Sequence, residues 1–263
     1  MKVRKVLYEE LTPAEFQSRL AEAPIAYLPL GTLEWHGEHM PLGADGLQSS
    51  GFFKRLAVEV GGIVLPMIFL GPDRRRKSGT RELYGMDIPK GNPRYPDQQL
   101  TGSAYWVPES TFKTLLESIL KQLKRAGFLI VVAHGHGPST IFFRDHARQW
   151  QRRFGLRCFH CWGSEYDKDG LGIQVDHGAM NETSLVMALR PELVQMGRLP
   201  KDPGVWPPGI GGKDPRTHAS RAVGERAIKL QLRRMSGILH EALKNLQASR
   251  RRTQAGGDRE VQP

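Results

Sequence analysis

Cysteine is scarce in this chain of 263 residues, which contains only Cys158 and Cys161. Two cysteines cannot provide a scaffold of disulfides. Their C-x-x-C spacing is compatible with a redox or zinc site. However, the neighbouring Leu156, Phe159 and Trp162 indicate a strand, on which residues three apart face opposite sides of the sheet. We therefore expect two buried, reduced thiols whose sulfur atoms diverge.

Long apolar runs are also absent. The longest is shorter than about ten residues, whereas a helix that crosses a bilayer needs about 20. The first residues, MKVRKVLYEELTPAEF, lack the apolar stretch of a secretory signal. We therefore expect no membrane partner and a cytoplasmic location. The hydrophobic fraction of 39% and the charged fraction of 25% are typical of a globular protein.

The positive charge is high but local. The formal net charge is +11, from 38 basic and 27 acidic residues, which allows an anionic partner such as nucleic acid. Basic runs lie at residues 74–77 and 250–252, and the second run belongs to a polar tail, 249–263, that we expect to be disordered. Because the excess lies in a loop and a tail, we do not expect nucleic-acid binding. If it did occur, the affinity would fall steeply with salt.

Apolar periodicity predicts strands and helices in alternation. The strands are predicted at 25–31, 63–67, 128–133, 157–162 and 171–175, and the main helices at 47–60, 109–126, 140–154, 182–194 and 218–247. A shorter helix is expected from Pro13, with Thr12 as its N-cap. This order favours one α/β domain over residues 1–248, with a mostly parallel sheet.

Residues 71–98 differ from the rest of the chain. They are rich in glycine, proline and charge, and they show no sustained period, so we expect a long loop. A loop of this kind could be a lid, with Arg81 and Tyr84 as contacts to a polar, hydroxylated or anionic substrate. It could equally be a solvated excursion or an oligomer contact.

Candidate metal ligands gather directly after the first predicted strand. Glu34, His36, His39 and Asp45 lie within twelve residues. Glu34 and His36 are two apart, so on an extended chain they project to the same side. The glycines that follow let the chain turn back and bring Asp45 to the same point. Carboxylates and imidazoles suit a divalent ion such as Zn, Mn or Fe.

Two further polar segments, 134–139 and 176–184, also follow predicted strand ends. Sites on parallel sheets lie at the carboxyl ends of the strands, which favours one shared site. Its candidate residues are Glu34, His36, Asp45, His134, His136, Asp176, His177 and Glu182. Two divalent ions held in such a site can polarise a carbonyl and activate water together, with Asp45 as the bridging carboxylate. The sequence has no G-x-S-x-G motif, which argues against a covalent serine mechanism.

The combination of motifs resembles the creatininase (creatinine amidohydrolase) family. LPLGTLEWHGEHMPLGADGL is similar to the family's N-terminal signature, and VVAHGHGPS is similar to its strand and GHGGN segment. DHGAMNETSLVMALRPELV is similar to its HAGxxETS segment, and GIGGKDPRTHAS to its C-terminal segment. The similarity extends over residues 7–245, in the same order and spacing.

The resemblance implies a three-layer α/β/α fold, a metal-dependent hydrolase that holds two divalent metal ions (Zn, Mn or Fe) per chain, and a homohexamer. It assigns the metal ligands to Glu34, His36, Asp45 and His136. Glu182 becomes a ligand or the base that activates water, and His177 becomes an acid or a substrate contact. The remaining candidates, expected near the substrate, are His39, His134, Asp176, Arg81 and Tyr84.

One position departs from the family pattern. Creatininase places a ligand carboxylate two residues after the histidine that matches His136, and Pro138 stands there in this chain. The second ion must therefore rely on Glu182 or be weakly held. We expect hydrolysis of a C–N bond in a small polar cyclic or formyl amide other than creatinine. The alternatives are a hydrolase that opens a cyclic keto-polyol by C–C cleavage (inosose-like) and a small-molecule-binding protein that has lost catalysis.

Overall fold

A four-stranded parallel sheet forms the centre of the computed structural model, which describes residues 4–88, 96–164 and 169–257. Its strands are β1 (Ile25–Leu30), β2 (Ile63–Val64), β5 (Ile130–Gly135) and β6 (Arg157–Phe159), in the order β2-β1-β5-β6. β1 and β5 lie side by side along their whole length, from the pair Ile25 and Ile130 to the pair Leu30 and Gly135. The parallel sheet expected from the sequence is confirmed.

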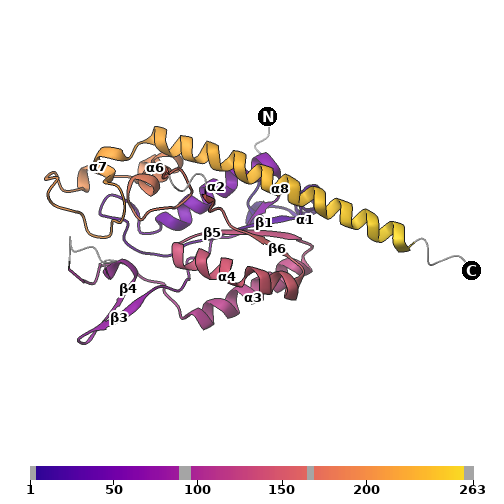
Figure 1. Cartoon of the computed structure of the whole chain (residues 1–263), viewed down its shortest axis with the longest axis horizontal. Coiled ribbons are helices and arrows are strands. Elements are labelled where there is room, and N and C mark those ends of the chain that lie inside the picture. The colour runs from indigo at the N-terminus through magenta and orange to yellow at the C-terminus, as the bar shows by residue number, and fades with distance from the viewer. Residues whose placement is uncertain (1–3, 89–95, 165–168, 258–263) are drawn as a thin grey trace, which may run out of the picture.

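Helices cover both faces of this sheet (Figure 1). Ile25 and Tyr27 of β1 pack on one face against helices α2 (Ala44–Val60), α6 (Met180–Leu189) and α8 (Arg221–Gly257). Ala26 and Leu28 point to the other face, against α3 (Glu109–Arg125) and α4 (Gly137–Phe154). Because both faces are covered, every residue of β1 is buried. The three-layer α/β/α architecture is confirmed.

Local sequence signals account for several helix boundaries. Helix α1 (Pro13–Glu22) begins with a capping box in which Thr12 and Glu15 bond each other's backbone N–H groups. Helix α4 ends at Gly155, which has a φ of 62°. Short helices also occur among the described residues: η1 (Tyr8–Glu10), η3 (Pro191–Leu193), η4 (Met196–Arg198) and α7 (Pro215–His218).

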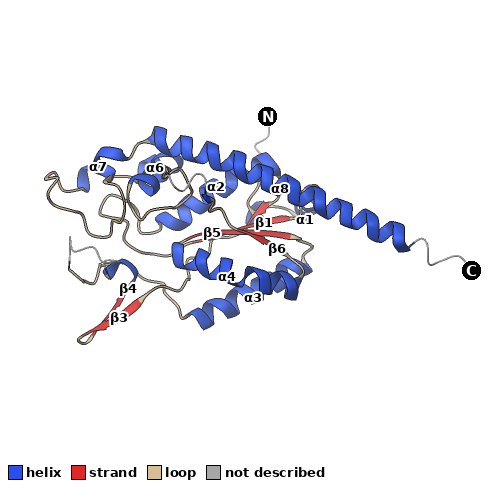
Figure 2. Cartoon of the chain, in the orientation of Figure 1, coloured by secondary structure: helices blue, strands red, loops and turns tan. Residues whose placement is uncertain are grey.

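The loop predicted at 71–98 contains regular structure. β3 (Arg75–Ser78) and β4 (Arg81–Tyr84) form an antiparallel hairpin, and the 3-10 helix η2 (Gly85–Asp87) follows it (Figure 2). All four residues of β3 are exposed, so the hairpin has no apolar alternation that could reveal it in the sequence. Residues 89–95 of the predicted loop lie outside the described residues.

Three other predicted elements need correction. Residues 171–175 are irregular rather than a strand, and Gln174 has a φ of 56°. The predicted helix at 182–194 ends at Leu189, shortly before Pro191, which cannot continue it. The predicted strand at 63–67 contains only β2, Ile63–Val64.

The predicted disordered tail is helical over most of its length. α8 continues to Gly257, beyond the predicted end at 247, and its C-terminal part projects from the body of the molecule (Figure 1). Residues 258–263 lie outside the described residues. Over the part of the chain that the structure describes, no helix is both long enough and apolar enough to cross a membrane.

The two cysteines are free, as predicted. Cys161 is buried, whereas Cys158 is half-buried. They belong to the apolar clusters on opposite faces of the sheet, which confirms that their side chains diverge. Burial raises the pKa of the Cys158 thiol to about 12, so this thiol is protonated at neutral pH.

Candidate metal centre

The carboxyl ends of β1 and β5 carry the candidate ligands into one place. Glu34 and His36 follow β1, and His136 follows β5 as the N-cap residue of α4. The strand ends are in close contact at Gly135, where φ is 151° and a Cβ atom would lie 1.6 Å from the carbonyl oxygen of Leu30. Glycine is therefore required there for the two ligand-bearing ends to meet.

Asp45 reaches the same place from a helix rather than from a loop. The sequence predicts that the chain turns back through glycines to present Asp45, with the next helix starting at residue 47. In the structure α2 already begins at Ala44, so Asp45 lies in its first turn. A carboxylate in the first turn of a helix is stabilised by the helix dipole, and this position fixes its direction.

The third contribution comes from the start of α6. Glu182 lies in its first turn, and its Oε2 accepts a hydrogen bond of 2.8 Å from the backbone N–H of Gly178. Asp176 accepts hydrogen bonds from the backbone N–H groups of Asn181, at 2.6 Å, and Glu182, at 3.0 Å. Asp176 therefore holds the start of this helix in position through both of its oxygens.

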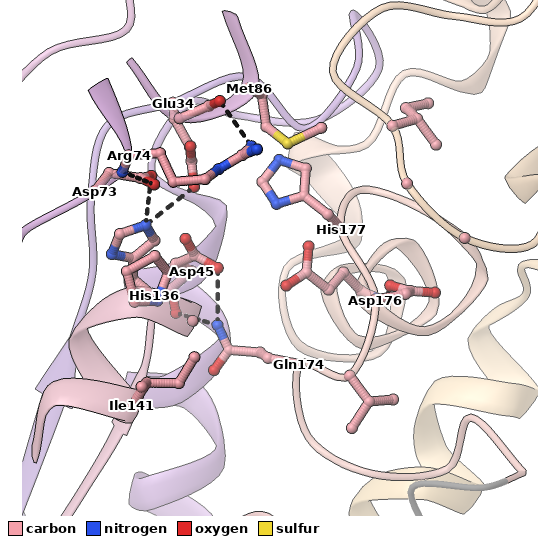
Figure 3. A pocket seen from close by; sticks show the side chains of 18 of the residues that line it. Glu34, Asp45, Asp73, Arg74, Met86, His136, Ile141, Gln174, Asp176 and His177 are labelled. Atoms are coloured by element: carbon pink, nitrogen blue, oxygen red, sulfur yellow. Dashed lines mark hydrogen bonds and ion pairs between the residues drawn. The ribbon is translucent and has the colours of Figure 1, made fainter. Parts of the chain in front are cut away.

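Two sets of three side chains meet around one carboxylate. The first set is Glu34, Asp45 and His136, and the second is His36, Asp45 and Glu182; within each set the potential ligand atoms lie within 4.8 Å of one another. His36 Nε2 lies 3.3 Å from Asp45 Oδ1 and 3.4 Å from Glu182 Oε2. His136 Nε2 lies 3.4 Å from Glu34 Oε1 (Figure 3). All five residues are buried, and Asp45 is common to both sets.

The electrostatics of this cluster indicate a shortage of positive charge. Burial raises the pKa of Glu34 to about 8, although His136 opposes the rise, and burial also raises the pKa of Glu182 well above its usual value. Burial would lower the pKa of His36, but the carboxylates of Asp45 and Glu182 outweigh it and raise that pKa to about 10. A cation among these groups would remove the need to protonate them.

Two atoms of the cluster have no hydrogen-bond partner among the described residues. They are His36 Nε2 and Asp45 Oδ2, both completely buried. An unpaired buried polar atom costs about 1–3 kcal/mol, which a metal ligand regains when it binds its ion. Imidazole nitrogen and carboxylate oxygen are the donors that Zn and Mn take in proteins. The residues present therefore fit divalent ions.

A cavity of about 860 Å³ opens above the cluster. Four of the five ligand candidates line it, and so do other polar and apolar side chains: Glu34, Asp45, His136, Glu182, Asp176, Met86, Ile141, Arg144 and Trp162. His177 also lines it, with its ring stacked on that of His36 at a centroid distance of 4.2 Å. A small molecule in this cavity would therefore lie directly against the candidate centre.

His177 is held in one tautomer. Its Nε2 lies 2.7 Å from the carbonyl oxygen of Trp35, so Nε2 carries a proton and donates it to that oxygen. Burial and the neighbouring His36 lower the pKa of His177 to about 3. The ring is therefore neutral at physiological pH, and Nδ1 is the nitrogen that can accept a proton.

Four of the predicted substrate contacts do not line this cavity. His39 Nε2 lies 2.8 Å from Thr183 Oγ1, and His134 lies in β5 with its Nε2 2.9 Å from the carbonyl oxygen of Ile173. Arg81 is exposed on the hairpin, and Tyr84 stacks on Trp106. Neither Arg81 nor Tyr84 is among the residues that line the cavity, and their role as substrate contacts stays a prediction. Asp176 is the one member of this group that lines it.

Two residues at the centre were not predicted from the sequence. Gln174 donates a hydrogen bond of 3.0 Å to Asp45 Oδ1, from a backbone that few non-glycine residues adopt. Asp73 lies 3.1 Å from His136 Nε2, at the base of the hairpin. Neither residue belongs to a group of polar residues that follows a predicted strand end. Their positions in the sequence therefore did not indicate a role at the centre. Pro138 lines the cavity but supplies no carboxylate.

Known proteins are similar to this chain in both sequence and structure. The family model for creatininase, described as creatinine amidohydrolase, matches residues 9–230. A creatinine amidohydrolase from Pseudomonas putida is 29% identical over 225 residues, which cover 78% of this chain and 80% of that protein.

Solved structures of creatininases share the fold. One described as a manganese form superposes with a TM-score of 0.68 at 26% identity, over 90% of this chain and 98% of the other. A mutant creatininase of Zn-Zn type has a TM-score of 0.68 at 25% identity, over 91% and 99%. A protein from Bacteroides fragilis, described as a putative creatinine amidohydrolase, has a TM-score of 0.65 at 18% identity over 91% and 96%, which shows the fold alone.

Proposed function

The chain belongs to the creatininase family, and from this we propose that it is a metal-dependent hydrolase that breaks an amide C–N bond in a small molecule. The observation that carries the proposal is the pair of buried ligand sets that share Asp45. A shared carboxylate between two sets of N and O donors is the arrangement expected for two neighbouring divalent ions. Zn and Mn are the ions we propose, because creatininase structures of Zn-Zn and Mn forms are among the similar proteins.

Each ion has its own proposed ligands. Glu34 and His136 would hold one ion, His36 and Glu182 the other, and Asp45 would bridge them. When bound, such ions polarise a carbonyl group and lower the pKa of a bound water. Gln174 supports the bridge, because its amide donates to Asp45 Oδ1 and leaves Oδ2 without a hydrogen-bond partner among the described residues.

His177 is the proposed proton carrier. Its Nε2–H is committed to the Trp35 carbonyl, which fixes the ring and leaves Nδ1 to take up a proton. A neutral imidazole can accept the proton that water loses on attack and deliver it to the departing nitrogen. Its stacking on His36 keeps it beside the reacting centre throughout.

The walls of the cavity favour a polar substrate. Arg144 and Arg74 bring positive charge to the lining, and Ile141 and Trp162 provide apolar and aromatic surface. A guanidinium binds a carboxylate through two parallel hydrogen bonds and can donate a single one to a hydroxyl oxygen. We therefore propose a small cyclic or formyl amide that carries an acidic or hydroxylated substituent.

The test is a hydrolysis assay of the protein loaded with Zn or Mn. The substrate panel contains lactams and formamides, each in a neutral form and in a carboxylated form, together with a cyclic keto-polyol. We expect turnover of an amide and a preference for the carboxylated member of each pair. The substitution Asp45→Asn should lower kcat by more than about 10²–10³-fold, which is the loss caused by removing a single oxyanion donor. Turnover of the keto-polyol alone would replace amide hydrolysis by C–C cleavage. Turnover of no panel member by protein shown to carry both ions would contradict the proposal.

A further inference from the structure

We propose that Asp73, which lies at the base of the β3–β4 hairpin, is a direct ligand of the ion that Glu34 and His136 hold. The assignment rests on the proposed function, because it presupposes an ion in that place. It adds a ligand from the segment 71–98, which the sequence predicts to be a long loop. The hairpin would thus be part of the metal centre rather than only a cover over it.

The first observation is the atom that Asp73 approaches. Asp73 Oδ2 lies 3.1 Å from His136 Nε2, and Glu34 Oε1 lies 3.4 Å from the same nitrogen. The side chains of Asp73 and Glu34 are 5% and 3% exposed. Two buried carboxylates therefore converge on one imidazole nitrogen.

The second observation concerns the hydrogen-bond partner of Nδ1, the other imidazole nitrogen of His136. His136 Nδ1 lies 3.0 Å from Ser139 Oγ, so the hydroxyl of Ser139 occupies it. A carboxylate that only orients a ligating histidine bonds the nitrogen that does not face the metal. Asp73 lies instead at Nε2, the nitrogen that Glu34 also approaches. This position is that of a co-ligand rather than of an orienting residue.

The third observation is the close approach of the two carboxylates at Gly85. A Cβ atom on Gly85, which has a φ of 50°, would lie 2.7 Å from Glu34 Oε2 and 2.8 Å from Asp73 Oδ2. Only glycine leaves room for both oxygens at this point. Two buried carboxylates in such proximity are costly unless a positive charge lies between them, which an ion would supply.

The backbone holds Asp73 in this orientation. Asp73 Oδ1 accepts a hydrogen bond of 2.6 Å from the N–H of Arg74, which leaves Oδ2 to face His136. The Arg74 guanidinium donates to the carbonyl oxygens of Gly85 and Ile88, both at 2.9 Å. These bonds close the base of the hairpin around Asp73, so the carboxylate is placed before any ion binds.

The two ions would then differ in their protein ligands. The ion beside the hairpin would have Glu34, Asp45, His136 and Asp73, whereas the other would have His36, Asp45 and Glu182. Sites with four protein ligands are characteristically closed, and sites with three keep a position for water or substrate. Loss of Asp73 should therefore weaken one ion and spare the other.

The experiment compares ion binding by the wild type, Asp73→Asn and Glu82→Gln. Asn preserves the shape of the side chain and its hydrogen bond to Arg74, and removes the charge. Glu82→Gln removes the same charge from an exposed position of the same hairpin and is the matched control. Ions per chain are measured by plasma mass spectrometry after equilibration with Mn or Zn, and electron paramagnetic resonance distinguishes coupled from isolated Mn. Thermal unfolding by circular dichroism establishes that each variant is folded.

We expect two ions in the wild type and in Glu82→Gln, with the signal of a coupled Mn pair. In Asp73→Asn we expect one ion and an isolated Mn signal. The affinity for the second ion should fall by more than about 10–100-fold, which is the loss typical of an orienting residue. Two tightly bound ions in Asp73→Asn, as in the wild type, would overturn the assignment and leave the proposed function intact. No ion in the wild type would overturn both.

Discussion

The central sheet and the β3–β4 hairpin both reach the candidate metal centre, but they are held in place by different forces. All six residues of β1 and of β5 are buried. In the hairpin, residues 75–84, Leu83 is the one buried side chain, and it belongs to none of the apolar clusters formed by the described residues. The sheet is stabilised by apolar burial and the hairpin by specific polar contacts.

The polar contacts of the hairpin lie at its base. Arg74 bonds the carbonyl oxygens of Gly85 and Ile88, and Asp87 accepts the backbone N–H groups of Tyr84 and Leu100. Such bonds are specific in direction but contribute about 1–3 kcal/mol each, whereas a sheet buried on both faces gains from every residue. The comparison teaches that global stability and the geometry of the site can be separated by mutation.

The largest expected effect comes from the same substitution made in both regions. Leu28 of β1 and Leu83 of β4 are 1% and 2% exposed, so Leu→Ala removes similarly buried groups. Leu28→Ala should lower the free energy of unfolding by about 3–5 kcal/mol, because a cavity opens in the core, and Leu83→Ala by less than about 2 kcal/mol. Urea unfolding followed by circular dichroism measures both. Equal losses would contradict the comparison.

An intermediate effect is expected of pH on ion affinity, and it arises from the titratable groups at the strand ends. In the absence of ions the pKa of Glu34 is raised to about 8 by burial, and that of His136 is raised to about 9, because Asp73 and Glu34 outweigh the effect of burial. Below these values both groups hold a proton that an ion must displace. Ion affinity should therefore rise with pH up to about 8–9, by about tenfold per unit for each proton released.

Calorimetry in buffers of different ionisation enthalpy measures this proton release directly. The matched control is Glu82→Gln, whose exposed carboxyl group belongs to the hairpin and should leave the release unchanged. An ion affinity that is flat between pH 6 and pH 9 would show that the strand-end groups are already deprotonated in the ion-free protein.

The smallest effect is expected at the outer face of the hairpin. Tyr84 stacks on Trp106 with a centroid distance of 4.9 Å and an interplanar angle of 9°. Tyr84→Ala should cost about 0.5–1.5 kcal/mol for the lost aromatic pair and leave KM and ion content unchanged. Steady-state kinetics with the amide identified from the panel provides the measurement. A rise in KM of tenfold or more would show that Tyr84 is a substrate contact.

The features that were predicted best from the sequence are those that depend on apolar periodicity and on the positions of strand ends. The parallel α/β arrangement and the N-cap at Thr12 follow from local patterns, and the three layers were implied by the family resemblance. The convergence of Glu34, His36 and His136 follows from the rule that parallel strands present ligands at their carboxyl ends. These signals are local, and each is repeated by several residues. They identified most of the candidate site.

What the sequence did not predict depends on contacts between distant segments. The hairpin has no apolar alternation, and Asp73 meets His136 only because the bonds of Arg74 close the hairpin base. The segment around Gln174 has the apolar residues of a strand, but it forms no strand pairing within the part of the chain that the structure describes, and Gln174 instead supports Asp45. Apolar periodicity cannot predict such polar contacts, because each contact depends on a single residue and not on a repeated pattern.

The pairing of β1 with β5 also determines when the centre can form. Ile25 pairs with Ile130, so the two strands are roughly a hundred residues apart in the chain, and closing so long a loop is slow. Until that closure, Glu34, His36 and Asp45 lie in the chain without His136. We therefore expect the complete centre to assemble late in folding, after α2 and α3 have formed from local contacts. Ions added during refolding should then change the final yield more than the rate of the first phase.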